Sequence, residues 1–467
     1  MALFLDSVAD KPAIVGAYYI SKNLKYFAQM FGKGGVRGFL DYARKYEWLR
    51  LPPNRGKLWE LMSHRNPAYR AATAASLTYI SFYVTNFIKN YLSEPEKVLW
   101  HEDLVPPQIF HAMGLHPFLV EAVPIIIPNV NNPLCEKYID IAENFGVPAD
   151  VCSLPKTVIG MVEADHFPPP KAIVTSNSPC DGGMASYLVL EKKYKVPVFR
   201  LDLPYSFTGN RGLAYYLNEV KRMIVFLEEV YRVKMDYDRL KEVCEEYNRA
   251  FAYSLDLFDL LRTSPAPFGG ETLVYSHLGY PLGGGTREVT ELMKTLLRIA
   301  KRSVERDGGG IPNERHRVIL WNPPPLIYPE LFLWMEKEYG AITVMDMLTY
   351  RRQYLIDTSN VDKMLVDLAR IMAYGPMAQH TRGPYENFFG DLFYMYESFN
   401  ADMIMMAAHL GCKNTRALLG MFRELCRKRR IPLLIFDYDL SDTRPCPPSG
   451  IKRQVADFME TIMGEKR

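Results

Sequence analysis

Runs of apolar residues alternate with amphipathic stretches along most of this chain. The first clear unit has an apolar run at 171–176, a loop, an amphipathic stretch at 184–195 and a second apolar run at 196–204. Short apolar runs predict buried strands, and apolar residues at helical spacing predict the helix between them. Strands that alternate with helices in this order are typical of βαβ units and a parallel sheet.

A second set of the same kind occupies the C-terminal part of the chain. Its predicted strands are RVILWN (317–322), AITVMDM (341–347), DMIMMAA (402–408) and PLLIFDYD (432–439), and its predicted helices are 329–340 and 415–430. Between the two sets, residues 211–262 interleave charged residues with Leu, Val, Met and Tyr at helical spacing. This stretch predicts long helices.

The pattern predicts an α/β protein with two Rossmann-like parallel-sheet domains. We expect a helical N-terminal extension over 1–97, a first α/β domain over 98–210, a helical region over 211–312 and a second α/β domain over 313–467. No repeat of short period is visible. The two α/β parts could be distant duplicates, but their sequences show no evident identity.

Composition removes several classes of protein. The chain has 467 residues with 48% hydrophobic residues, enough for two or three domains with their own cores. A net charge of +3 offers no electrostatic support for nucleic-acid binding. The apolar stretch at 77–92 is interrupted by Thr, Ser, Asn and Lys, and the first residues lack the pattern of a signal peptide. We therefore expect a soluble cytoplasmic protein that binds neither nucleic acid nor a membrane.

Two cysteines fall at equivalent places in the pattern. Cys180 follows the strand that ends near Ser176, Cys412 follows the strand that ends near Ala408, and each precedes a predicted helix. Open α/β sheets bind ligands at the carboxyl ends of their strands, and a helix N-terminus favours a thiolate. Cys152 lies in a polar turn before another predicted helix.

Three thiols from three loops are compatible with three kinds of site. They suit an iron–sulfur cluster with one iron that lacks a cysteine, a zinc site with an open position, or simply packed thiols. The spacing alone leaves these alternatives open, because the seven cysteines of the chain form no CxxC pair. His409, three residues before Cys412, is compatible with a donor to such a site or with an ordinary loop histidine.

Three segments around these cysteines resemble one known family. DVCSLPKTVIGMV (150–162), the segment 174–205 that contains SNSPCDGG, and the segment 409–444 that begins HLGCKN are similar to the 2-hydroxyacyl-CoA dehydratase and benzoyl-CoA reductase superfamily. The resemblance covers roughly residues 98–467. Three separated cysteines match in order, each within its local context.

The resemblance implies a function and a cofactor. Cys152, Cys180 and Cys412 would hold one four-iron four-sulfur cluster in an oxygen-sensitive subunit that pairs with a homologous second subunit. A separate ATP-dependent iron–sulfur activator would supply the electron. In the dehydratases, a ketyl radical formed from the acyl-CoA expels the neighbouring hydroxyl group, and in the aryl-CoA reductases related chemistry reduces an aromatic ring. The first expectation is a dehydratase, and the alternative is a subunit of a benzoyl-CoA-type reductase.

The segment WHEDLVPPQIFHAMGLHPFLVE (100–121) resembles a further block of the same family. By that likeness, Glu121 would be an acid or base near the active site. Many dehydratases have serines after the tryptophan, whereas this chain has His101, Glu102 and Asp103. Asp103 occupies the position of a serine near the open iron and would act as a base or as an iron ligand. A rival from a different class is a non-catalytic cluster or zinc protein, which would be a scaffold or an electron-transfer module.

Overall fold

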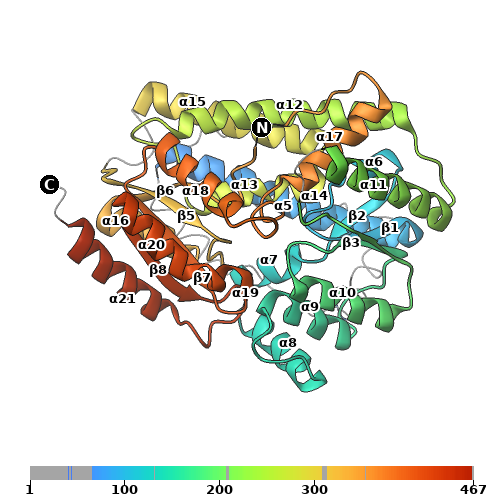
Figure 1. Ribbon diagram of the computed structural model, residues 1–467, viewed down its shortest axis with the longest axis horizontal. Coiled ribbons are helices and arrows are strands. Elements are labelled where there is room, and N and C mark those ends of the chain that lie inside the picture. Colours follow the sequence, from blue (N-terminus) through green and yellow to red (C-terminus); the bar gives the residue numbers. More distant parts are fainter. Residues whose placement is uncertain are drawn as a thin grey trace.

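Two parallel sheets form the frame of the protein (Figure 1). The computed structural model describes residues 66–130, 132–206, 210–307, 313–352 and 354–464, together with the isolated helical positions Leu40 and Arg44. The strands are β1 (Val98–His101), β2 (His116–Leu119), β3 (Ala172–Ser176), β4 (Val198–Leu201), β5 (His316–Trp321), β6 (Ala341–Asp346), β7 (Met403–His409) and β8 (Leu433–Tyr438).

The two sheets have the same topology. Their strand orders are β2-β1-β3-β4 and β6-β5-β7-β8, so in each sheet the second strand lies at the edge and the first and third strands are central. All the paired strands in both sheets are parallel. The predicted α/β class with two parallel sheets is therefore confirmed.

The central strands are buried because helices cover both faces of each sheet. Every residue of β3, β5 and β7 is buried, and these strands read as nearly continuous apolar runs. Such runs are typical of parallel strands that contact helices on both sides. This burial explains why the sequence identified them. β1 and β2 are shorter, and each contains a histidine.

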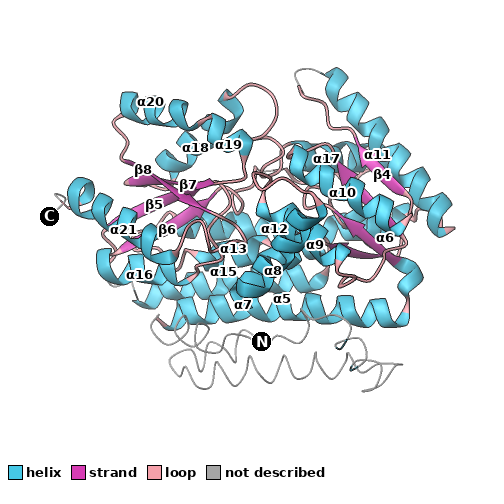
Figure 2. Ribbon diagram, turned by 90° about the horizontal axis from the view of Figure 1, so that it is seen from below, coloured by secondary structure: helices cyan, strands magenta, loops and turns pink. Residues whose placement is uncertain are grey.

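Helices lie around both sheets (Figure 2) and belong to the first, middle and last parts of the chain. Those in the first part are α5 (Pro67–Ser93), η2 (Pro95–Lys97), α6 (Gln108–Ala112), α7 (Ala122–Val130), α8 (Asn132–Phe145), α9 (Ser153–Glu163) and α10 (Asp181–Tyr194). Those in the middle are α11 (Asn210–Tyr231), α12 (Tyr237–Leu261), α13 (Glu271–His277), α14 (Gly279–Gly283) and α15 (Arg287–Asp307). Those in the last part are α16 (Glu330–Tyr339), α17 (Val361–Ala373), α18 (Glu386–Ser398), α19 (Lys413–Ala417), α20 (Leu419–Arg429), α21 (Pro448–Phe458) and the π-helical turn η3 (Met459–Met463).

Helix α5 connects the two halves of the molecule. It packs with α13 and α15, and α15 in turn packs along α12 (Figure 1). The Tyr69 hydroxyl, near the start of α5, lies 2.6 Å from the Gly269 carbonyl oxygen and 2.9 Å from Glu336 Oε1, on α16. Further along the same helix, the Tyr83 hydroxyl accepts a hydrogen bond from the Leu119 amide of β2 at 3.1 Å.

The predicted N-terminal extension, 1–97, lies mostly outside the described residues. Within 1–97 the structure describes α5 and η2 with the residues that flank them, together with the positions Leu40 and Arg44. The two elements and the two isolated positions are all helical. The side chains on one long stretch of α5 are buried in this chain's own core. The apolar character of 77–92 therefore reflects internal packing.

The predicted helix at 415–430 is interrupted in the structure. It is divided into α19 and α20 at Leu418, whose amide donates to the Thr415 carbonyl oxygen at 3.1 Å. This bond spans three residues and tightens the chain in the manner of a 3₁₀ turn. The helix predicted at 184–195 begins earlier, at Asp181, so Gly182 and Gly183 form part of its first turn.

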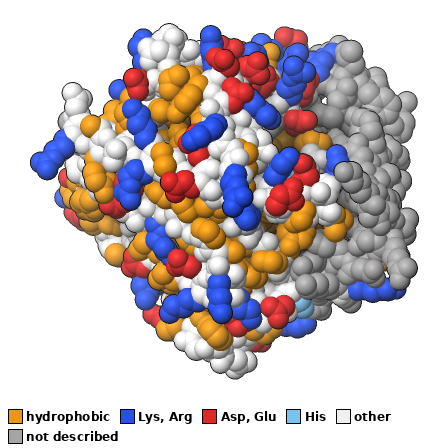
Figure 3. Space-filling view, turned by 90° about the vertical axis from the view of Figure 1, so that its right-hand side faces the viewer, with side chains coloured by type: hydrophobic (Ala, Val, Ile, Leu, Met, Phe, Trp, Pro, Cys, Tyr) orange, Lys and Arg blue, Asp and Glu red, His pale blue; other side chains and the backbone are white. Residues whose placement is uncertain are grey.

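The surface carries charges of both signs. On the face in Figure 3, lysine and arginine side chains lie interspersed with aspartate and glutamate side chains. This agrees with the small net charge of +3 and gives that face no field of a single sign. None of the helices in the described ranges combines the length and the apolar character that crossing a bilayer requires.

The contact between α8 and α9 gives a test of the packing. A Cβ at Gly160 would lie 1.9 Å from the Tyr138 carbonyl oxygen, so Gly160→Ala must push the two helices apart. We expect a loss of about 1–3 kcal/mol in the free energy of unfolding, measured by urea denaturation. Gly420→Ala is the matched control, because Gly420 also lies in a helix and a Cβ there meets no atom within 4 Å. Equal losses in the two variants would contradict this account.

Candidate functional site

A cavity of about 1590 Å³ lies where the carboxyl ends of the two sheets face each other. Residues that follow strands of both sheets line it: Asp103, Glu121, Asn177, Asn322, Met347 and Gly411. The first and third strands are neighbours in both sheets, and the direction in which successive strands are added to the sheet reverses between them. Such a switch point is where open α/β sheets bind their ligands.

The three cysteines selected from the sequence all line this cavity. Each stands immediately before a helix: Cys152 before α9, Cys180 before α10 and Cys412 before α19. The backbone N–H groups at the start of a helix carry partial positive charge, which favours a thiolate over a thiol. Cys180 is exposed, and Cys152 and Cys412 are partly buried. The four other cysteines are buried and do not line the cavity.

Two of the thiols have a polar neighbour at hydrogen-bond distance. Cys152 Sγ lies 3.0 Å from Nε2 of His409, and Nδ1 of the same ring lies 3.6 Å from Asp439 Oδ2. Cys412 Sγ lies 3.0 Å from Thr415 Oγ1, which donates to Asn322 Oδ1 at 3.1 Å. These neighbours orient the two sulfur atoms toward the cavity and are of the kind that tune a metal ligand.

Glycines provide the space beside the thiols. A Cβ at Gly411 would lie 2.3 Å from the Cys152 Cα, so only glycine allows the Cys412 loop to approach the Cys152 loop this closely. A Cβ at Gly183 would lie 3.8 Å from Cys180 Sγ and 3.9 Å from Glu121 Oε1. It would occupy space between the thiol and the carboxyl group.

The described residues contain no group of three His, Cys, Asp or Glu side chains arranged to hold a single metal ion. The three thiols therefore face one cavity without converging on one point. Burial raises the pKa of the Cys180 thiol to about 11 and raises the pKa of the Cys152 thiol well above its ordinary value. A metal group would have to displace these protons on binding.

A group of carboxyls, of which Glu102 is buried and Asp103 and Glu121 are partly buried, lies on the Cys180 side of the cavity. Burial, and then the charge of Asp103, raises the pKa of Glu121 to about 7, and burial raises the pKa of Asp103 to about 6. The Asp103 amide donates to Glu121 Oε2 at 3.1 Å, which fixes the position of that carboxyl group. Glu102 does not line the cavity and accepts hydrogen bonds from the Thr175 hydroxyl at 2.9 Å and the Ser176 amide at 2.5 Å.

A family described as "2-hydroxyglutaryl-CoA dehydratase, D-component" matches residues 104–462 of this chain. The chain belongs to that family. The match covers both sheets except β1 and includes all three cavity cysteines. The superfamily that the sequence resembles is thereby confirmed.

Three relatives of this chain are subunits of enzymes. One subunit of the benzoyl-CoA reductase of Thauera aromatica is 23% identical over 69% of this chain and 78% of its own length. The alpha subunit of (R)-2-hydroxyglutaryl-CoA dehydratase of Acidaminococcus fermentans is 24% identical over 34% of each chain. The alpha subunit of (R)-2-hydroxyisocaproyl-CoA dehydratase of Clostridioides difficile is 23% identical over 50% of this chain and 59% of its own length. This member of the family is accordingly an enzyme subunit of the dehydratase and reductase type.

The structure places Glu121, Asp103 and the three cysteines at one cavity. Sequence reasoning did not identify Thr415 or Asp439 as neighbours of the thiol groups. Asp439 is distant in sequence from the Cys152 loop that it supports through His409, and Thr415 lies within a predicted helix. Their positions were the only indication in the sequence. Asp439 lies at the end of a predicted strand, and Thr415 lies at the start of a predicted helix.

The buried carboxyl of Glu121 predicts a pH dependence of stability. Its pKa is raised from 4.5 to about 7, so between these values the folded protein holds a proton that the unfolded chain releases. Stability must therefore fall as pH rises through this window, by an amount on the order of 2 kcal/mol from this group. Glu121→Gln should flatten the fall, measured as the free energy of unfolding in urea from pH 4.5 to pH 7.5. The same change at Glu242, which is exposed on α12, should leave the slope intact. An unchanged slope in Glu121→Gln would contradict the assignment.

Proposed function

We propose that this chain is the iron–sulfur subunit of a 2-hydroxyacyl-CoA dehydratase, in which Cys152, Cys180 and Cys412 hold one four-iron four-sulfur cluster. The observation that carries the proposal is the presence of these three thiols, from three helix starts, on one cavity between two sheets. Family membership supports the class of enzyme. The cluster and the elimination of water belong to the proposal.

The residues around the cavity fit such a cluster. Three cysteines are the ligand number for a cluster that keeps one iron open. The three thiols all line one cavity, as a polynuclear group with several ligands requires. Ser178, two residues before Cys180, is buried, and its hydroxyl oxygen has no hydrogen-bond partner among the described residues. A cluster sulfide or a thiolate would give it one.

When bound, the cluster would supply the single electron that turns an acyl-CoA thioester into a ketyl radical. The protein's own part is to hold substrate and protons. Because the pKa of Glu121 is about 7, this carboxyl carries a proton in much of the population near neutral pH. It is suited to give that proton to a departing hydroxyl group. The Asp103 amide holds the carboxyl of Glu121 in place.

The proposed enzyme needs partners. The named relatives are subunits of larger enzymes, and we propose that this chain likewise pairs with a homologous second subunit. We further propose that an ATP-dependent iron–sulfur activator delivers the electron. The substrate would be an acyl-CoA, for which a cavity of about 1590 Å³ has room.

Two observations favour a second function, reduction of an aryl-CoA. The match to a subunit of a benzoyl-CoA reductase covers 78% of that relative's length. Asp103 also supplies a carboxyl group where the resemblance leads us to expect a serine in dehydratases. A rival of another class is an electron-transfer subunit that holds a cluster without binding substrate. The experiment adds activator, ATP and either a 2-hydroxyacyl-CoA or benzoyl-CoA to the complex purified under nitrogen. Turnover of the 2-hydroxyacyl-CoA indicates a dehydratase, and turnover of benzoyl-CoA indicates a reductase. Turnover of neither indicates an electron-transfer subunit.

The cluster assignment is tested by single cysteine variants. Cys152→Ser, Cys180→Ser and Cys412→Ser should each lower iron and acid-labile sulfide per chain by half or more, because each removes a thiolate ligand. The protein must be purified without oxygen, and its visible spectrum recorded. Cys446→Ser is the matched control, because this cysteine does not line the cavity and should keep full iron content. A colourless wild-type protein that contains zinc would exclude the cluster.

The role of Asp103 is tested by Asp103→Ser, which introduces the hydroxyl group expected of dehydratases. If the carboxyl takes part in proton transfer, turnover should fall about 10-fold or more, and the pH profile should lose its limb near pH 6. Iron content should remain at the wild-type level, which separates this effect from loss of the cluster. Unchanged turnover together with an unchanged cluster spectrum would remove Asp103 from the mechanism.

A further inference from the structure

Glu102 carries a buried carboxyl group that binds the end of the neighbouring strand. It directly follows β1, is 2% exposed and does not line the cavity. Its backbone amide donates to the Val174 carbonyl oxygen at 3.2 Å. Its Oε2 accepts hydrogen bonds from the Thr175 hydroxyl at 2.9 Å and the Ser176 amide at 2.5 Å. The last residue of β1, His101, pairs with Val174, so the Glu102 side chain continues the contact with β3 where β1 ends.

Ser176 extends this contact to the loop that carries Cys180. Its Oγ lies 3.4 Å from Glu102 Oε1 and donates to the Ser178 carbonyl oxygen at 2.7 Å. The same Oγ accepts a hydrogen bond from the Ser178 amide at 3.1 Å. Ser178 lies two residues before Cys180. A short chain of hydrogen bonds therefore leads from the Glu102 side chain to the backbone beside the thiol.

The same loop has a second attachment on its other side. The Asn177 side chain accepts a hydrogen bond from the Leu203 amide at 2.9 Å and donates to the Leu203 carbonyl oxygen at 3.2 Å. Leu203 follows β4. A variant that loses the Glu102 carboxyl would keep this attachment, so the loop would be loosened rather than removed from the fold.

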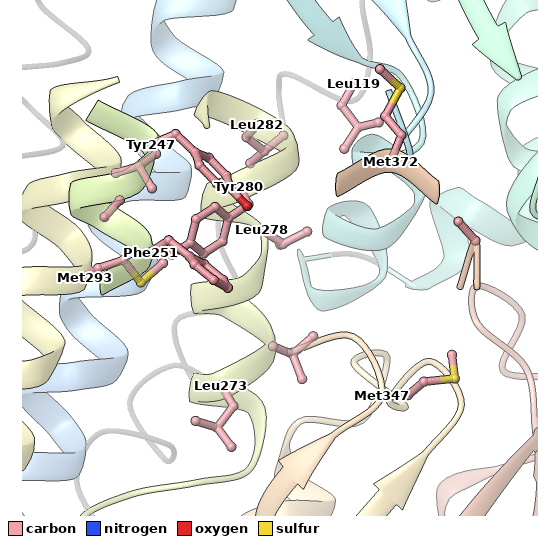
Figure 4. Close-up of a cluster of buried hydrophobic side chains, with 14 of the residues drawn as sticks. Leu119, Tyr247, Phe251, Leu273, Leu278, Tyr280, Leu282, Met293, Met347 and Met372 are labelled. Atoms are coloured by element: carbon pink, nitrogen blue, oxygen red, sulfur yellow. The ribbon is translucent and has the colours of Figure 1, made fainter. Parts of the chain in front are cut away.

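The residue after Glu102 positions the acid pair, by which we mean Asp103 and Glu121. The Asp103 amide donates to Glu121 Oε2 at 3.1 Å. Glu121 itself comes two residues after Leu119, the last residue of β2. Figure 4 shows Leu119 within a cluster of buried apolar side chains, and it is 1% exposed. The chain before Glu121 is thus fixed by packing, and the Asp103 amide fixes the carboxyl group at its end.

The Cys180 thiol and the Glu121 carboxyl lie beside the same small space. A Cβ on Gly183 would be 3.8 Å from Cys180 Sγ and 3.9 Å from Glu121 Oε1. Both groups also line the cavity. Glu102 is connected to the thiol loop through its side chain and to Glu121 through the backbone amide of the next residue. One residue outside the cavity therefore contacts the supports of both groups.

We propose that Glu102 is a positioning residue that sets the separation between the Cys180 thiol and the acid pair. The inference rests on the proposed function, in which Cys180 binds the cluster and Glu121 gives a proton at the same cavity. Proton transfer requires the two partners to be within hydrogen-bond reach. A displacement of about 1 Å can lower a rate by about 100-fold, so a fixed separation between the cluster ligand and the acid matters for the reaction.

Two variants of Glu102 test the hydrogen bonds. Glu102→Ala removes the oxygen atom that accepts from Thr175 and Ser176. Glu102→Gln keeps a carbonyl oxygen that can accept the same bonds, and it should behave as the wild-type protein does. Asp367→Ala is the matched control, because this carboxyl is 8% exposed, accepts the Asp357 amide at 2.8 Å and does not line the cavity. All variants are purified under nitrogen as full-length protein with the subunits that accompany it.

Amide hydrogen exchange, followed by mass spectrometry, reports the order of both supports. In Glu102→Ala, fragments that cover 174–184 and 101–106 should exchange about 10-fold faster or more, because the bonds that close these segments are lost. Fragments that cover 409–416, around Cys412, should keep the wild-type rate. Glu102→Gln and Asp367→Ala should keep it in all three segments. Wild-type exchange throughout Glu102→Ala would overturn the inference, whether or not the protein holds a cluster.

Ser176→Ala tests one of the two routes with a smaller risk to folding. It removes the hydroxyl that bonds to Ser178 and leaves the bond from the Ser176 amide to Glu102 in place. Exchange should rise about 3-fold or more in 174–184 and remain at the wild-type rate in 101–106. Equal acceleration of both segments, or of neither, would contradict separate routes from Glu102 to the thiol and to the acid pair.

Iron content separates a positioning role from a general loss of stability. Glu102→Ala should lower iron per chain by about half or more, because the Cys180 ligand is no longer held in place. Glu102→Gln should restore the wild-type content. Asp367→Ala should keep its iron even where urea denaturation shows the same loss of stability as in Glu102→Ala. Equal losses of iron in Glu102→Gln and Glu102→Ala would overturn positioning by these hydrogen bonds.

The outcomes distinguish this inference from the proposed function. Cys180→Ser that keeps its iron would overturn the proposed role of the thiol as a cluster ligand. Cys180→Ser that loses iron while Glu102→Ala keeps it would overturn the inference alone.

Discussion

The close approach of two loops, one from each half of the protein, is the constraint on which the site depends. The loop after β7 passes so near the start of α9 that a methyl group at Gly411 would lie 2.3 Å from the Cys152 Cα. This contact places Cys412 beside Cys152 although they are far apart in the chain. It also brings His409 Nε2 within 3.0 Å of the Cys152 sulfur. The cavity exists because the two sheets direct their carboxyl ends at each other across this contact.

The repetition of one topology explains how a site of this kind is built. Each sheet has the order second, first, third, fourth, so each has its switch point between its first and third strands. Cys180 follows the third strand of one sheet and Cys412 follows the third strand of the other. Two equivalent positions thus supply one thiol each to a shared cavity, and Cys152 completes the set from the start of a helix. The acids come from the first sheet alone.

Most of the fold could be predicted from the sequence, because the central strands are fully buried and read as apolar runs. β1 and β2 were not delimited, since four-residue strands that contain His101 or His116 lack that pattern. The position of Cys180 and Cys412 after strands was sufficient to place each at the carboxyl edge of its own sheet. Contacts such as that of Cys152 with His409 were beyond sequence reasoning, because they depend on how the two sheets are oriented. Burial also decides which of two neighbouring acids can act at the cavity. Asp103 lines the cavity, whereas Glu102 is enclosed within the protein.

Helix α5 limits how the protein can admit a ligand. Tyr69 bonds to groups beside the second sheet, and Tyr83 bonds to β2 of the first sheet, so one continuous helix is attached to both halves. The Tyr69 contacts are buried, and breaking them without water to replace them is costly. A hinge motion that separates the two halves would therefore have to break these contacts. We therefore expect ligand entry and exit to depend on rearrangement of side chains and loops at the mouth of the cavity.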